Sequence, residues 1–130
     1  FTRRDDSILA RSALALSAMS ITAEELLRRG VARHREGRIE EAEGLYRRAL
    51  RLAPRHPDAE NLLSVIALQK GDVAGALAHS ERALQAAPAH PLFLSNRGAA
   101  LAAAGRLAEA VEVLRRTLEQ NPQDVTSLRN

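Results

Sequence analysis

Apolar residues recur three and four positions apart in the stretch REGRIEEAEGLYRRALRLAP, which runs from Arg35 to Pro54. Charged residues fill most of the positions between them, and this spacing predicts an amphipathic helix. Small residues stand at Gly37, Ala42 and Ala49, and Pro54 closes the stretch. An amphipathic helix requires none of these residues, so their positions need a further explanation.

The same pattern recurs twice further along the chain, each time 34 residues on. The second copy is QKGDVAGALAHSERALQAAP, from Gln69, and the third is AAGRLAEAVEVLRRTLEQNP, from Ala103. The position of Ala49 and Ala83 holds Thr117 in the third copy. Three copies in one register indicate a repeat architecture. The matching residues are Gly37, Gly71 and Gly105; Ala42, Ala76 and Ala110; Leu50, Leu84 and Leu118; and Pro54, Pro88 and Pro122.

This period and punctuation resemble the tetratricopeptide repeat, a helix–turn–helix unit. The resemblance implies that each 34-residue unit has a first helix of about 14 residues, a turn at the glycine and a second helix that the proline ends. The resemblance implies an all-α fold, a right-handed superhelical solenoid of antiparallel helix pairs. Its units are residues 23–56, 57–90 and 91–124, with an additional helix expected before them.

Small side chains are expected where paired helices approach closely, and larger ones in the layers between them. The small residues are Gly30, Ser64, Gly98, Ala42, Ala76 and Ala110, and the larger ones are Leu26, Leu63, Leu94, Leu101, Tyr46, Leu50, Leu84, Leu114 and Leu118.

Thr22 and Glu25 fit a capping box that opens the first unit.

The first helix of the first unit departs from the family pattern. The usual leucine and tyrosine positions hold Arg29 and Arg33, and the tryptophan position of the second unit holds Glu60. We expect the two arginines to reach solvent along their aliphatic stems, or another element to cover that face.

Residues 1–22 precede the three units and are expected to be helical, because Leu9, Ala13 and Leu16 share one stripe. MSITAEELL, from Met19, is typical of a natural start, so residues 1–18 are either an upstream extension or an added leader. If ordered, this segment would cap the first unit or occupy the groove of its own or a neighbouring molecule.

Residues 125–130 begin a further helix and then stop, so we expect a fragment of a longer protein. The last second helix would then expose apolar surface around Val111, Leu114 and Leu118, which favours end-to-end association.

The composition excludes several classes of function. The chain has no cysteine, which excludes disulfides, thiolate zinc sites and cysteine nucleophiles. No apolar run approaches the length of about 18 residues that a membrane span needs, and we expect a cytoplasmic protein without a membrane partner. The net charge is +3, but acids are interleaved with the arginines, so no nucleic-acid partner is expected.

No constellation of residues predicts catalysis. His34, His56, His79 and His90 do not fall at metal-ligand spacing, and we expect them to be surface residues. Glu40, Glu41 and Glu43 are expected on a solvated helix face. We therefore predict no enzyme activity, cofactor or metal for this segment.

The resemblance implies a binding groove lined by the first helices. The second, fifth, sixth, ninth, twelfth and thirteenth positions of each unit face this concave side. The residues carried over are Leu27, Val31, His34 and Arg35; Asn61, Leu62, Val65, Leu68 and Gln69; and Ser95, Asn96, Ala99, Ala102 and Ala103, with Arg55, His56 and His90 at the edge.

Two known types of groove fit this set poorly. A lysine/asparagine/arginine clamp for a C-terminal carboxylate is absent, since its positions hold Leu27, Val31, Asn61, Val65 and Gln69. An asparagine ladder for an extended backbone is at best partial, with Asn96 in place and Asn61 one residue away. A mostly apolar strip remains, which suits an amphipathic helix or an apolar peptide.

Three hypotheses for function follow. The first is a protein–protein interaction scaffold that binds a protein or peptide partner in the groove. The second is the substrate-recruiting arm of a larger bacterial glycosyltransferase or sulfotransferase, because the units resemble the N-terminal repeats of such proteins. The third is a self-assembling module, joined through its repeat ends or its N-terminal helix.

Overall fold

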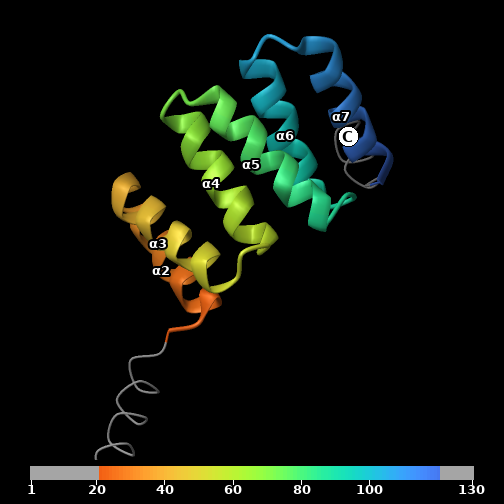
Figure 1. The fold of residues 1–130 in the computed structure, drawn as a ribbon. Coiled ribbons are helices and arrows are strands. Elements are labelled where there is room, and N and C mark those ends of the chain that lie inside the picture. The colour runs from red at the N-terminus through yellow and green to blue at the C-terminus, as the bar shows by residue number, and fades with distance from the viewer. Residues whose placement is uncertain (1–20, 121–130) are drawn as a thin grey trace, which may run out of the picture.

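Three antiparallel helix pairs follow one another in a row in the computed structural model, which describes residues 21–120 (Figure 1). The first helices are α2 (Ala23–Arg35), α4 (Pro57–Gln69) and α6 (Pro91–Ala103), and the second helices are α3 (Ile39–Leu52), α5 (Val73–Ala86) and α7 (Leu107–Gln120). No strand occurs in these residues. The predicted all-α helical repeat array is confirmed. The expectations for the N-terminal helix and for residues 125–130 lie outside the described residues.

The glycine turns have the predicted backbone conformation. Gly37, Gly71 and Gly105 adopt φ angles of 80°, 80° and 78°, the left-handed region that side chains with a Cβ rarely occupy. The residue after each glycine donates its N–H into the preceding helix; Arg38 N, for example, lies 2.9 Å from the carbonyl oxygen of Arg33. Each turn thereby satisfies carbonyls at the end of the first helix.

The helix ends differ slightly from the sequence expectation. The second helices α3 and α5 end two residues before Pro54 and Pro88. At the other end of the array, Thr22 Oγ1 accepts the N–H of Glu25 at 3.1 Å. The Glu25 carboxylate faces Arg28 and Arg29, so only the threonine half of the expected capping box is observed.

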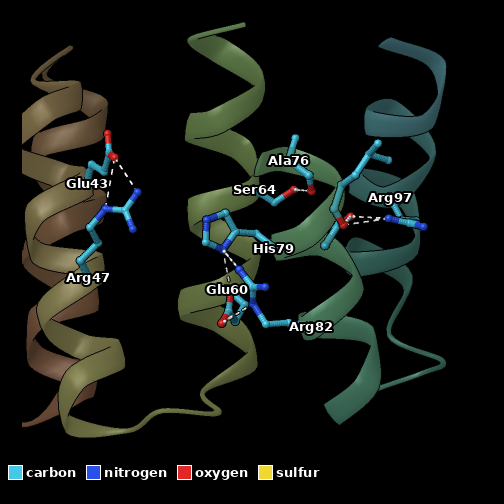
Figure 2. Close-up of polar contacts among 10 residues, drawn as sticks. Glu43, Arg47, Glu60, Ser64, Ala76, His79, Arg82 and Arg97 are labelled. Carbon is cyan, nitrogen blue, oxygen red and sulfur yellow. Dashed lines mark hydrogen bonds and ion pairs between the residues drawn. The ribbon is translucent and has the colours of Figure 1, made fainter. Parts of the chain in front are cut away.

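Small residues lie where the paired helices meet, as the repeat pattern predicts. Gly30 lies against the ring of Tyr46, and Gly98 lies against Leu114. Ser64 Oγ donates a hydrogen bond of 2.9 Å to the carbonyl oxygen of Ala76, which joins α4 to α5 (Figure 2).

Five of the nine predicted large core residues are buried, Leu50 and Leu84 are partly buried, and Leu114 and Leu118 are exposed. Leu114 and Leu118 on α7 remain 41% and 40% exposed, because no helix among the described residues covers the outer side of α7. Phe93 is a core residue that the repeat pattern did not single out; it is buried and stacks on His90 at 3.9 Å between ring centroids.

Successive pairs pack through the second helix of one pair and the first helix of the next. α3 contacts α4 and α5 contacts α6, while α4 also contacts α6 directly. The first helices therefore form one side of the array, on which the predicted groove residues lie.

Candidate peptide-binding groove

A cavity of about 580 Å³ lies between α2 and α4. Its apolar wall consists of Leu27, Val31 and Ala32 from α2 and Leu62 from α4. Charged and polar residues complete the lining: Glu24, Arg28 and Arg35 from α2, and His56 and Asp58 at the start of α4. Apolar walls with a few polar groups at the rim are the usual composition of a binding site.

Two hydrogen bonds show that α2 and α4 run side by side in the same direction. His56 Nε2 lies 3.2 Å from Glu24 Oε1 and joins the beginnings of the two helices. His34 Nε2 lies 2.7 Å from Gln69 Oε1 and joins their ends. The cavity therefore follows two parallel helices, like a groove that could receive an elongated ligand.

The two carboxylates of this groove lie at one of its ends. Glu24 and Asp58 lie in the first turns of α2 and α4, whereas Arg35 is the last residue of α2. Hydrogen bonding to a backbone N–H and to His56 holds the pKa of Glu24 below its ordinary value. One end of the groove consequently carries two carboxylates with Arg28 beside them, and the other end is basic.

The structure brings some predicted residues together and leaves others apart. Leu27, Val31, Arg35 and Leu62 share the cavity. His34 pairs with Gln69. The remaining predicted residues lie on α4 and α6 outside the cavity lining: Asn61, Val65, Leu68, Ser95, Asn96, Ala99, Ala102 and Ala103.

The two asparagines of the possible ladder are bonded to each other. Asn96 Nδ2 donates to Asn61 Oδ1 at 2.7 Å, and Asn61 is buried. This bond uses donor and acceptor capacity that a backbone ladder would need for a peptide.

Several lining residues were absent from the predicted set. Glu24 and Asp58 occupy the second position of their units and Arg28 the sixth, so the family rule marks them although they were not carried over. Ala32 follows no position of that rule. It lines the cavity only because α2 and α4 stand apart along this edge.

The expectation of surface histidines is wrong for His56 and His79, whereas His90 is exposed. The side chains of His56 and His79 are only 16% and 13% exposed. His79 Nδ1 lies 2.7 Å from Glu60 Oε2, and Arg82 Nε donates to Glu60 Oε1 at 3.1 Å (Figure 2). Glu60 is buried at 5% exposure, and these partners from α5 compensate its charge.

Glu43 was also wrongly expected on a fully solvated face. Its side chain is mostly buried and accepts hydrogen bonds from Lys70 Nζ and Arg47 Nη2, both at 2.9 Å. The Lys70 ammonium, followed by the Arg47 guanidinium, holds the pKa of Glu43 below its ordinary value. The pair connects α3 to the end of α4 and therefore stabilises the junction between the first two helix pairs.

Two kinds of site are absent from residues 21–120. Nowhere in this range do three or more histidine, aspartate or glutamate residues converge in a way that could hold a metal ion. None of the six helices combines the length and the apolar character that crossing a membrane requires.

Two family models described as tetratricopeptide repeat match residues 27–91 and residues 67–130. A curated relative, the TPR repeat-containing thioredoxin TTL4 of Arabidopsis thaliana, is 39% identical over 90 residues, which make up 68% of this chain and 13% of that protein. The chain thus spans only a small part of this relative.

Solved structures show the same fold. The first TPR of Spaghetti (RPAP3) bound to the HSP90 peptide SRMEEVD is similar with a TM-score of 0.74 and 25% identity, over 78% of this chain and 80% of that one. An O-GlcNAc transferase from Thermobaculum terrenum has a TM-score of 0.74 and 26% identity, over 77% of this chain but 19% of that one. MamA, at 22% identity, a TM-score of 0.69 and coverage of 81% and 57%, shows the fold alone.

Proposed function

We propose that this chain, which belongs to the tetratricopeptide repeat family, binds an amphipathic helix or apolar peptide between α2 and α4. Its architecture is that of a protein-interaction scaffold. The observation that carries the proposal is the cavity with Leu27, Val31 and Leu62 on its walls. Burying one leucine-sized side chain of a ligand there would contribute about 1.5–3 kcal/mol. No catalysis is proposed for residues 21–120.

The groove chemistry favours an apolar ligand over a C-terminal carboxylate. The RPAP3 neighbour is bound to the HSP90 peptide SRMEEVD, whose last residue is acidic. In this chain the clamp positions are apolar or amide side chains, and Leu27 and Val31 are among them. The binding energy would therefore come mainly from apolar burial, with the charged ends of the groove selecting orientation.

The charged groups at the two ends of the groove predict the direction of the ligand. A basic ligand residue would lie near Glu24 and Asp58, and an acidic one near Arg35. Between them, apolar side chains spaced as on one helix face or on alternate positions of a strand would contact Leu27, Val31 and Leu62.

A random dodecapeptide library displayed on phage, selected against the full 130-residue chain, tests this proposal. The enriched sequences should share two or three large apolar residues in a helical or alternating spacing. Affinity of the enriched peptides, measured by titration calorimetry, should fall at least tenfold in Val31→Glu, because a carboxylate would replace part of the apolar wall.

Val111→Glu is the matched control, since Val111 is an exposed valine on α7, away from this groove. It should leave the affinity unchanged, and circular dichroism should show equal helicity in both variants. Equal affinity for wild type, Val31→Glu and Leu62→Glu would refute the groove assignment.

A second candidate function is that of a recruiting arm for a catalytic domain encoded elsewhere in a longer protein. It is favoured by the similarity to an O-GlcNAc transferase, of which the chain matches only 19%. Reading the gene beyond the codon for Asn130 tests this: a transferase domain would support it, and an early stop codon would oppose it. Self-association remains a prediction.

A further inference from the structure

The first helix pair has an open face that the other two pairs do not have. In the second pair, Leu63 belongs to the buried cluster that includes residues of α3, and Leu63 and Ala67 are 2% and 8% exposed. The same repeat positions in the first pair hold Arg29 and Arg33, whose side chains are 54% and 41% exposed. We call this surface the arginine face; it surrounds a hollow of about 550 Å³ and consists of Arg29, Arg33, Glu41, Gly44, Leu45, Arg47, Arg48 and Arg51.

The junction between α5 and α6 shows which kind of element fits such a face. Arg97 on α6 occupies the repeat position of Arg29. Its Nη1 donates to the carbonyl oxygen of Leu77 at 2.8 Å and to Ser80 Oγ at 3.4 Å, both on α5 (Figure 2). The guanidinium group of an arginine at this position therefore finds hydrogen-bond acceptors on the preceding second helix, where a serine lies opposite it.

Residues 5–18, DDSILARSALALSA, have the register of such a helix. This stretch is as long as α3 and α5, and it stands 34 residues before α3. Ser12 matches Ser80, Ala15 matches the buried Ala49 and Ala83, and Leu16 matches the partly buried Leu50 and Leu84. Residues 19–22 equal in length the links 53–56 and 87–90.

Several residues of the segment depart from the pattern of α3 and α5; Asp5, for example, stands where both helices begin with an apolar residue, Ile39 and Val73. Ile8 stands where α3 and α5 have Ala42 and Ala76. The backbone of Ala76 lies against the first helix of its own pair, because its carbonyl oxygen accepts a hydrogen bond from Ser64. A helix that packs only on the next pair has no need of a small residue there.

The ion pair between Glu43 and Lys70 at the α3–α4 junction has no counterpart here, because Leu9 and Glu36 stand at those two repeat positions. The segment begins with Asp5 and Asp6, and the last turn of α2 is basic, with Arg33, His34 and Arg35. In an antiparallel arrangement the start of the segment would lie near this end of α2.

We propose that residues 5–18 form a helix that covers the arginine face of their own molecule, as α3 covers α4 and α5 covers α6. Ser12 then accepts a hydrogen bond from Arg29, and Ala15 and Leu16 pack against α2. Because the segment is tethered directly to α2, its effective concentration at the face is in the millimolar range. The groove between α2 and α4 stays open for a partner, and the inference stands independently of what that partner is.

Cysteine pairs test the proposal, because the full chain has no cysteine of its own. Ser12→Cys is combined with Arg29→Cys on the arginine face, or with Val31→Cys in the groove, two residues along the same helix. A short bismaleimide then links the two thiols, and intact mass distinguishes links within one molecule from links between two. Reactivity of the single-cysteine variants toward a monofunctional maleimide corrects for thiol accessibility.

The Ser12–Arg29 pair should cross-link within the molecule at least tenfold faster than the Ser12–Val31 pair. Adding Leu16→Arg should remove this preference, since it places a charge where Leu50 and Leu84 pack in the other junctions. Three outcomes would overturn the proposal: equal rates for both pairs, a faster Val31 pair, which would place the segment in the groove, or links mainly between molecules.

Discussion

Gly30 lies so close to the ring of Tyr46 that a Cβ on Gly30 would stand 2.3 Å from Tyr46 Cε1. Tyr46 is fully buried, and burial raises the pKa of its hydroxyl above the ordinary value. The ring can therefore not move aside into solvent. This contact sets the distance between α2 and α3, and α2 carries one wall of the proposed groove.

Replacing Gly30 by alanine should destabilise the fold by about 1–3 kcal/mol, because the added methyl group overpacks a filled interior. Urea unfolding followed by circular dichroism measures this change. Gly44→Ala is the matched control: Gly44 is also helical, and a Cβ there would meet no atom within 4 Å. It should stabilise the protein by roughly 0.5–1 kcal/mol. A Gly30→Ala variant as stable as wild type would show that the helix pair is not tightly packed.

The buried carboxylate of Glu60 predicts an asymmetric response to mutation. Glu60→Leu should leave the free energy of unfolding nearly unchanged or raise it, because an apolar residue needs no charge partner. The equivalent residues of the other two units, Leu26 and Leu94, are buried leucines. Arg82→Ala should destabilise by about 1–2 kcal/mol, less than for a fully buried pair because Arg82 is half exposed.

Thermal unfolding of both variants measures this asymmetry, with Arg116→Ala as control, since Arg116 is exposed at the same repeat position of α7. A larger drop in melting temperature in Glu60→Leu than in Arg82→Ala would mean that the ion pair itself stabilises the fold.

The contacts of Glu43 predict a pH-dependent contribution to stability. Its pKa is lowered from 4.5, so its contribution is present above that value and is lost as the pH falls through the lower, folded-state pKa. Hydrogen bonding to Glu43 raises the pKa of Lys70 from 10.5, so the contribution of Lys70 is lost as the pH rises beyond that value. The difference in melting temperature between wild type and Glu43→Gln should be largest near neutral pH and shrink at both extremes.

Glu41→Gln provides the comparison for this pH series, because Glu41 is exposed and its ion-pair partners within residues 21–120 are the exposed Arg33 and Arg38. At neutral pH, Glu41→Gln should lower the melting temperature less than Glu43→Gln does. A Glu43→Gln difference that is the same at pH values near 3 and near 7 would contradict the proposed contacts.

The repeat pattern alone predicted the helix pairs, the glycine turns and the close contacts at Gly30, Ser64 and Gly98. These features follow from local spacing, which the sequence displays directly. The pairs of Glu60 with His79 and of Glu43 with Lys70 could not be predicted in this way. Their partners are 19 and 27 residues apart and meet only because adjacent helices pack.

The candidate site was predictable in part. The family rule placed Leu27, Val31, Arg35 and Leu62 on one surface, and the structure adds that they share a cavity. The spacing of residues along α2 and α4 does not reveal how far apart the two helices stand. The size of the cavity therefore required the structure.

The groove can be tested most directly by a nitrogen–proton correlation titration of the labelled 130-residue chain with one of the selected apolar peptides. The account predicts that the backbone signals that shift most belong to Leu27, Val31 and Leu62, while those of Val111 and its neighbours on α7 stay in place. Shifts confined to the arginine face or to α7, with the groove signals unchanged, would contradict it.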